Sequence, residues 1–411
     1  MKILALAASL AAMSAAVPPA AVQPAATQEG TWHTRLRDTW TRTAGERWIT
    51  LQLEPDTDRR LSFSIPLAEL SGLAAAGDDW TANDVQFTVN RDAGNLVFSG
   101  DFRNGRGSGT YRFTPNAAYV TAMAQRFGEL SGRDLLRLAA HDVSRSFVAS
   151  MEAEGYKGLD LDELVKMRIH GVDAAYVQGF RQAGYSGLSA EDLVRTRIHG
   201  ATPQYVLAMS SAGYTGLSIE SLVKTRIHGA TPAFAQEVKA AGYGQLDVDD
   251  LVKMRIHGVT PDFIKQMRDL GYADVTIEDL VKLRIHGASP EFIREMRSLG
   301  FKDLTLSQAV KMRIHGVSAD FVKELRGLGY NELDIEDLVK MRIHGVTPQF
   351  IRELKDLGYS GVRSERLVQF RIHGVDADFI REVRAAGFKD LSAEELVEFS
   401  IHGRRWMRKR G

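Results

Sequence analysis

The stretch Leu280–Gly287 reads Leu-Val-Lys-Leu-Arg-Ile-His-Gly, and its last four residues, Arg-Ile-His-Gly, return along the chain at a fixed interval. The histidines of this signature stand 29 residues apart from His170 to His373. His402 and the more divergent His141 keep the same step. Because periods of this length are typical of arrays built from one repeated unit, the sequence predicts a repeat array.

Residues 276–304 illustrate one unit. Thr276 followed by Asp279 is a capping-box pattern that predicts a helix start, and Gly287 is placed to end that helix in the left-handed conformation. The residues spaced as one helical face are predicted to be buried: Ile277, Leu280, Val281 and Ile285.

A second helix is predicted to begin at the capping residue Ser289 and Pro290, and to end at Gly300. Its predicted buried stripe consists of Phe292, Ile293, Met296 and Leu299. Helices this short are not stable alone, so each must be buried against neighbouring units. The predicted fold class is α+β, with a small N-terminal antiparallel β-domain followed by an α-solenoid of about ten helical hairpins, each of 29 residues.

Glycines repeat with the units. Nine follow the histidines, from Gly171 to Gly403, and nine more follow the second helices, from Gly155 to Gly387. Both sets are predicted to end helices, because glycine adopts the left-handed conformation without strain.

The N-terminal segment differs from the rest. Residues 1–16 combine Lys2, a short apolar run and a small-residue end, which is typical of a secretory signal peptide; an alanine-rich helix is the alternative. Residues 17–30 are rich in Pro, Ala, Gln and Thr and are predicted to be a linker. We therefore expect an exported bacterial protein, periplasmic or secreted, without a transmembrane segment once the signal is removed.

Residues 31–114 alternate with a period of two, which predicts the small β-domain. A helical insertion is predicted around residues 67–75. The glycine-rich run at 105–109 lies between two predicted strands with no helix after it, so it indicates a hairpin rather than a phosphate loop. The predicted strands are 48–53, 61–65, 85–89, 96–102 and 110–113.

Residues 115–403 form the predicted solenoid, whose first helix is expected to start at Thr114-Pro115. The unit of His141 carries Ala-Ala-His-Asp in place of the signature, as terminal units often do. One late unit has arginine at both cap positions, 363 and 366, so its helix is predicted to start at Ser364 or to fray.

Residues 404–411 are a basic tail. They are either a contact with an anionic envelope surface or acidic partner, or a solvated helix end. The candidate partner-binding residues of the tail are Arg404, Arg405, Arg408, Lys409 and Arg410.

Composition excludes several functions. The 52 basic residues balance the 52 acidic ones, so no global field attracts nucleic acid. The chain has no cysteine, which excludes disulfides, thiol catalysis and cysteine-ligated zinc. Since no nucleophile–base–acid pattern stands out, we expect no enzyme activity, no cofactor and no metal.

The signature residues are assigned a structural role. The histidines suit the negative end of a helix, and a row that gains charge below about pH 6 is the alternative. The arginines lie on the core side and are predicted to clamp units together through free carbonyls, or through an acid of the next unit such as Asp279 or Asp337; a groove for carboxylates or phosphates is the alternative. The signature consists of Arg168, His170, Gly171, Arg197, His199, Gly200, Arg226, His228, Gly229, Arg255, His257, Gly258, Arg284, His286, Gly287, Arg313, His315, Gly316, Arg342, His344, Gly345, Arg371, His373 and Gly374.

The stretch Leu338–Tyr359 resembles the helical repeats at the C-terminal end of some bacterial BlaR-type membrane metallopeptidases and related exported proteins. The segment from Asn90 to Asn116 resembles the part that leads into those repeats. The resemblance implies a helical repeat architecture and an exported setting. It implies no protease activity, because the metallopeptidase motif and its transmembrane helices are absent from this sequence.

The leading functional hypothesis is a non-enzymatic scaffold that binds a protein or cell-envelope partner. The candidate partner-binding residues on the repeats are Tyr176, Tyr205, Phe234 and Phe263. A regulatory or sensory module of an envelope-stress or peptidase-linked antibiotic-resistance system is the second hypothesis. The third is an enzyme with its site around Trp32, His33, Asp38 and Trp40.

Overall fold

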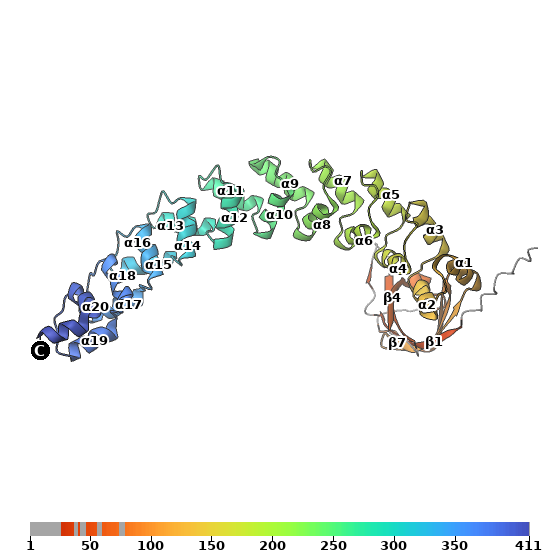
Figure 1. Ribbon diagram of the computed structural model, residues 1–411, viewed down its shortest axis with the longest axis horizontal. Coiled ribbons are helices and arrows are strands. Elements are labelled where there is room, and N and C mark those ends of the chain that lie inside the picture. Colours follow the sequence, from red (N-terminus) through yellow and green to blue (C-terminus); the bar gives the residue numbers. More distant parts are fainter. Residues whose placement is uncertain (1–25, 37–39, 42–46, 56–59, 74–78, 411) are drawn as a thin grey trace, which may run out of the picture. The chain divides into compact units, whose positions relative to one another are not determined.

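The structure is a computed structural model that describes residues 26–36, 40–41, 47–55, 60–73 and 79–410; of residues 40–41 and 404–410 it describes the backbone alone. The predicted signal peptide and most of the predicted linker lie outside these residues. The chain is α+β, as predicted, with an antiparallel sheet followed by an array of about 20 helices (Figure 1). It divides into two compact units, residues 1–206 and 207–411, which are described one at a time.

The first unit opens with a seven-stranded antiparallel sheet in the order β2-β3-β1-β7-β6-β5, with β4 also paired to β3. Leu51 pairs with both Thr34 and Phe63, so β4 and β1 flank β3 on opposite sides. The strand β4 therefore forms an edge of the sheet. The strands are β1 (Gln28–Arg35), β2 (Trp40–Thr41), β3 (Arg47–Pro55), β4 (Leu61–Pro66), β5 (Ala82–Arg91), β6 (Gly94–Arg103) and β7 (Arg106–Pro115).

All five predicted strands are confirmed, but the two-residue β2 was not predicted, and neither was β1. It begins inside the segment predicted as linker and pairs with both β3 and β7. Within the described part of the predicted helical insertion, only the 3-10 helix Leu67–Glu69 forms. The glycine-rich run is part of a hairpin, as predicted: Asn104 and Gly105 make the turn at positive φ, and β7 starts at Arg106.

Aromatic side chains fill the inside of the sheet. Trp32 is fully buried, with ring centroids 5.1 Å from Phe87 and 5.6 Å from Phe102, and its indole donates a hydrogen bond to the Ser99 carbonyl. Gly107 faces this cluster, because a Cβ there would lie 2.5 Å from the Phe102 ring. The core thus needs glycine in the strand where the ring approaches the backbone.

Six helices of the first unit follow the sheet, and α7 crosses the boundary between the units. The first helix is capped by Asn116 and not by the predicted Thr114-Pro115, which ends β7. Asn116 is favoured because its side-chain oxygen accepts from the amides of Ala118 and Tyr119. These helices are α1 (Ala117–Phe127), α2 (Gly132–Ala140), α3 (Arg145–Ala153), α4 (Leu161–His170), α5 (Ala174–Gln182), α6 (Ala190–His199) and α7 (Pro203–Ser211).

The helices of the second unit continue the same alternation. From α8 to α18 the even-numbered helices end in the Arg-Ile-His-Gly signature, and the odd-numbered ones end before the second set of glycines. They are α8 (Ile219–His228), α9 (Pro232–Val238), the π-helix Lys239–Tyr243, α10 (Val248–Ile256), α11 (Pro261–Asp269), α12 (Ile277–His286), α13 (Pro290–Ser298), α14 (Leu306–Ile314), α15 (Ala319–Gly327), α16 (Ile335–Ile343), α17 (Pro348–Asp356), α18 (Ser364–Ile372), α19 (Ala377–Ala385) and α20 (Ala393–Arg410).

Most helix ends follow the predicted chemistry. Thr276 caps α12 by accepting from the Asp279 amide, and Gly287 ends it at a φ of 68°. The helix after Arg363 begins at Ser364, as predicted, and lacks a side-chain cap. Gly403 is an exception and corrects the prediction: it lies inside α20 without a positive φ, so that helix continues through it.

Neighbouring hairpins are joined by two recurrent hydrogen bonds. A tyrosine after the second helix donates to a carbonyl in the next unit, as Tyr330 does to Val362 over 2.7 Å. An arginine near the end of the second helix donates back to the preceding unit, as Arg297 does to the Leu270 carbonyl over 2.7 Å. The arginine bond satisfies a carbonyl at the C-terminal end of a helix, which has no intrahelical partner, and the tyrosine bond satisfies a loop carbonyl just before the next helix.

Candidate functional site

The isoleucine of each signature is exposed. Ile285 is 54% exposed, whereas Leu280 and Val281 of the same helix are 0% and 4% exposed. The prediction that Ile285 belongs to the buried stripe is therefore wrong. Among the described residues, the exposed large hydrophobics are Leu207 and the signature isoleucines Ile169, Ile198, Ile227, Ile256, Ile285, Ile314, Ile343, Ile372 and Ile401, which we call the isoleucine row.

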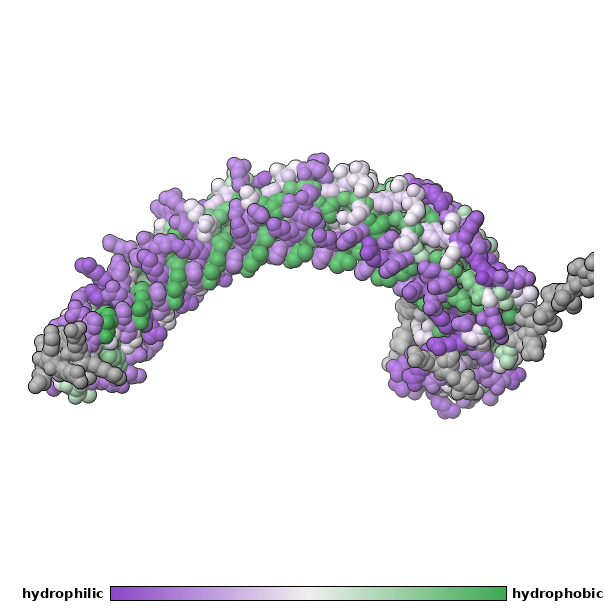
Figure 2. Space-filling view, viewed as in Figure 1, coloured by the Kyte–Doolittle hydropathy of each residue, from purple (hydrophilic) through white to green (hydrophobic). Residues whose placement is uncertain are grey.

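The end of the helix explains this exposure. At about 100° per residue, Arg284 points nearly along the buried Leu280, while Ile285 points nearly along Val281, at the margin of the buried stripe and away from Leu280 and Leu283. No further turn follows to cover it, because Gly287 stops the helix. Figure 2 shows hydrophobic residues recurring along the edge of residues 207–411 that carries α8, α10, α12 and α14.

The signature arginine takes the position over the core. In the second unit the five from Arg255 to Arg371 stack on an aromatic ring of the preceding hairpin, with the guanidinium carbon 4.8 to 5.2 Å from the ring centroid, as Arg342 does on Phe321 and Arg313 on Phe292. In the first unit, Arg197 also donates to the Gly171 carbonyl over 3.0 and 2.8 Å. These contacts fit the predicted clamp through a free carbonyl, and they point to the preceding unit and not to an acid of the next one.

These stacked arginines keep a free edge. They are exposed, and within the described ranges no carboxylate forms an ion pair with the five that run from Arg255 to Arg371 in steps of 29 residues. Four of the lysines that stand three residues before the isoleucines have partners, such as Lys311 with Glu336 at 2.6 Å. From Ile256 to Ile372 the isoleucine row is therefore flanked by arginines that are held in place by stacking and are not paired with a described carboxylate.

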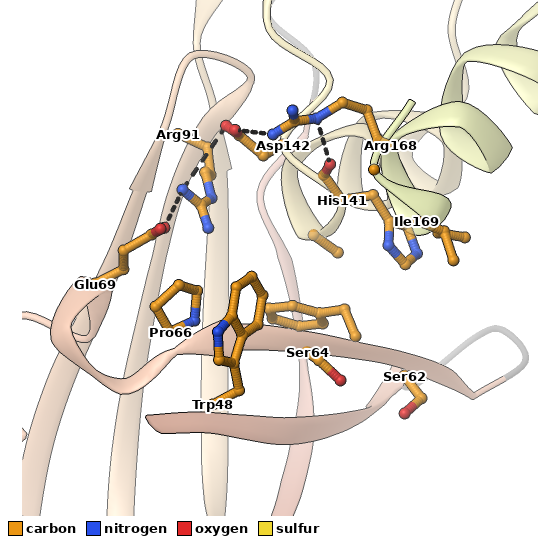
Figure 3. A pocket seen from close by; sticks show the side chains of 13 residues that line it. Trp48, Ser62, Ser64, Pro66, Glu69, Arg91, His141, Asp142, Arg168 and Ile169 are labelled. Carbon is orange, nitrogen blue, oxygen red and sulfur yellow. Dashed lines mark hydrogen bonds and ion pairs between the residues drawn. The ribbon is translucent and has the colours of Figure 1, made fainter. Parts of the chain in front are cut away.

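The first unit contains a cleft of about 430 Å³, and Ile169 is among its lining residues (Figure 3). Trp48 and Pro66 lie on one side of it, and His141 and Ile169 on the other. The first repeat is what makes room for it, because Ala140 stands where the other units have isoleucine.

A chain of alternating charges closes the top of the cleft. Glu69 and Arg91 are 2.6 Å apart, Asp142 lies 3.7 Å from Arg91, and Asp142 also pairs with Arg168. Asp142 occupies the position of the signature glycine and keeps a positive φ of 53°. Aspartate is one of the few residues that tolerate this conformation, and here its carboxylate binds two arginines from different elements.

His141 differs from the other repeat histidines. Burial lowers its pKa to about 4, and the positive charge of Arg137 acts in the same direction. Its ring centroid lies 6.5 Å from that of Phe63, edge to face. At neutral pH the cleft wall is thus an uncharged imidazole, which can both donate and accept one hydrogen bond.

The aromatic residues predicted to bind a partner are buried instead. Tyr176, Tyr205, Phe234 and Phe263 are 4 to 8% exposed, and this prediction is corrected. They belong to the core because each is the first large residue of its second helix, and signature arginines cover three of them: Tyr176, Phe234 and Phe263. The side chains of the basic tail from Arg404 to Arg410 lie outside the described residues.

The third hypothesis is not supported by the strand geometry. Trp32 points into the core, whereas the next residue, His33, is exposed on the opposite face of β1. Asp38 and the side chain of Trp40 lie outside the described residues. Successive residues of a strand point to opposite faces, so Trp32 and His33 do not share a site.

No protein-family model matches the chain, and no curated protein sequence matches it. Over the part that the structure describes, no group of three or more histidines, aspartates or glutamates is arranged to hold a metal ion. In that same part, every helix is too short or too polar to cross a membrane.

Proposed function

We propose that this protein is a non-enzymatic, exported repeat scaffold that binds an extended polypeptide along the isoleucine row. The observation that carries the proposal is that nearly all exposed large hydrophobics among the described residues occupy one position of the repeat. Single exposed apolar residues are common on protein surfaces, but a contiguous apolar patch is typical of an interaction site.

The fold leaves the isoleucines of the row partly uncovered. Each isoleucine is about half exposed, so covering it would contribute roughly 1 kcal/mol of hydrophobic free energy. Seven such residues, from Ile227 to Ile401, lie in the second unit. Their combined gain, roughly 7 kcal/mol, lies within the range of the translational and rotational free-energy cost of association, so further contacts such as those to the arginines have to offset the ordering of a flexible segment.

The spacing of the row favours an extended chain. Packed helices lie roughly 8–10 Å apart. A polyproline II segment has three residues per turn and rises about 3.1 Å per residue, so one turn advances about 9 Å. A partner in that conformation would present every third side chain to successive isoleucines.

The arginines beside the row favour acidic residues in the partner. The five arginines from Arg255 to Arg371 are stacked and exposed, and no described carboxylate pairs with them, so their remaining N–H groups are available. A guanidinium that is already held in place loses less conformational entropy when it binds a carboxylate. We therefore expect Asp or Glu next to the apolar residues of the partner.

The exported setting rests on the sequence of residues 1–16 and on the resemblance to the repeats of BlaR-type proteins. Both support a partner in the bacterial envelope. The basic residues 404–410 are a second element of the proposal, as a contact with an anionic surface.

Site-specific photo-crosslinking in living cells tests the proposal. A photoreactive amino acid at Ile285 or Ile314 should crosslink to a discrete protein band. The same residue at Lys282, which is exposed on the same helix, is the control and should give a weaker band. Equal crosslinking from both positions, or no band from either isoleucine position, would refute binding along the row.

A further inference from the structure

The cleft borders a strand whose outer edge is open. Three consecutive residues of β4 line it, namely Ser62, Phe63 and Ser64. Because successive side chains point to opposite faces of a sheet, a cleft that touches all three faces the edge of the strand itself. The cleft therefore reaches the edge of β4, and Trp48 of the neighbouring strand β3 also lines it.

No described strand pairs with that edge. β4 pairs with β3 alone, and the partners β1 and β2 lie on the other side of β3, since Trp48 pairs with both Trp40 and Pro66. Every second residue of β4 thus turns its N–H and C=O groups toward the cleft. Such an edge is a template for another extended chain.

The walls of the cleft suit an aromatic side chain. Trp48 and Pro66 face His141 and Ile169 across it (Figure 3). Phe63 also lines the cleft, with its ring centroid 6.5 Å from that of His141. Aromatic rings pack well against indole, imidazole and proline surfaces. Ala140 stands at the position of the signature isoleucine, and its smaller side chain leaves space for the ring.

The charged groups around the cleft balance one another, so the cleft does not favour a charged ligand. Two carboxylates, Glu69 and Asp142, balance two guanidinium groups, Arg91 and Arg168. They do offer donors and acceptors to a polar group at the tip of a ring. A tyrosine hydroxyl or a tryptophan N–H would meet that requirement.

We infer that the open edge of β4 and the cleft beside it form a docking site for an extended peptide segment, which pairs with β4 as an added strand and places a tyrosine or tryptophan in the cleft. Main-chain hydrogen bonds would hold the segment in register, and the cleft would select the side chain. The inference rests on the proposed function for the nature of the partner. It adds where that partner is anchored, because Ile169 of the isoleucine row also lines the cleft.

The test begins with a random phage-displayed peptide library panned on the full chain. Enriched peptides are synthesised, and their affinities are measured by fluorescence anisotropy. N-methylation of one peptide residue at a time then removes single main-chain donors. We expect methylation at alternate residues to weaken binding roughly tenfold or more, and methylation at the residues between them to have little effect.

Two protein variants complete the test. Trp48→Ala removes a wall of the cleft and should weaken binding at least roughly tenfold, as loss of a buried aromatic contact does at interfaces. Trp80→Ala removes an indole that packs on Phe102 and does not line the cleft, so it is the matched control. Thermal melting of both variants shows whether the sheet remains folded.

Three results would overturn the inference. They are the absence of any enriched peptide, an affinity that N-methylation changes equally at alternate residues and at the residues between them, and equal effects of Trp48→Ala and Trp80→Ala in folded protein. Failure of the proposed function would look different. In that case peptides would bind with the alternating pattern, but the photoreactive residue at Ile285 would capture nothing in cells.

Discussion

The exposure of Ile285 can be tested by comparing two truncations in one helix. Leu280 is fully buried, so Leu280→Ala should destabilise the array by about 3 kcal/mol through lost burial and the cavity left behind. Ile285 is 54% exposed, and alanine is the better helix former, so Ile285→Ala should change stability by only about 0.5 kcal/mol.

Urea unfolding of the full chain measures the total change, and hydrogen exchange of the α12 amides shows where it occurs. Exchange is needed because stability in repeat arrays is distributed over units and their interfaces. Val281→Ala is a second buried control, since Val281 is 4% exposed. If Ile285→Ala destabilised α12 as much as Leu280→Ala, the isoleucine would be covered in solution. The observation that carries the proposed function would then be lost.

Three further predictions concern single residues. Gly287→Ala should destabilise the protein by about 1 kcal/mol, because φ is 68° at Gly287, whereas Gly403→Ala should stabilise it by up to about 1 kcal/mol, because Gly403 lies inside α20. Urea unfolding measures both changes in stability, and equal effects of the two variants would contradict the helix assignments. Arg284→Lys keeps the charge but loses the planar stack on Phe263, so a loss of about 1 kcal/mol is expected, and wild-type stability would show that the stack contributes little. The pKa of His141 falls from 6.5 to about 4 on folding, so stability should decrease as the pH is lowered from 6.5 to 4, because the unfolded state binds the proton more tightly. His141→Gln should lack this decrease, and NMR titration gives the pKa directly.

The repeat fold is predictable from the sequence because local signals agree. At α12 the cap residue Thr276, the buried residues Leu280 and Val281, and the stop at Gly287 all specify the same helix. The same spacing misplaced Ile285. The helical periodicity assumes that the helix continues beyond Ile285. The helix ends at Gly287, so no further turn covers a residue at the margin of the buried stripe, and that residue becomes exposed.

The missed strand β1 shows a different limit. Its inward positions include Gly30 and Thr34, and only Trp32 carries a large apolar side chain within the strand, so the alternation is weak. Gly30 is required by its neighbour, because a Cβ there would lie 2.3 Å from the Glu54 carbonyl oxygen. Pairing with a distant strand determines that glycine, and a local pattern does not reveal it.

The cleft could not be predicted as a site, because its residues come from β3, β4, β5 and the ends of α2 and α4. Two substitutions in the first repeat did carry a signal. Asp142 replaces the signature glycine and Ala140 replaces the isoleucine, although the surrounding unit keeps the repeat register. Asp142 departs from the repeat and yet retains the positive φ of the glycine, which indicates that its side chain makes a specific contact at this position.

The arginine and the isoleucine of the signature can be separated by what each does for the fold. Arg284 covers Phe263, so stability alone would retain it at every unit. Ile285 leaves 54% of its surface exposed, and its branched side chain is a poorer helix former than alanine or leucine. Since the fold gains little from isoleucine at this position, its recurrence from Ile169 to Ile401 is better explained by a surface that something else covers.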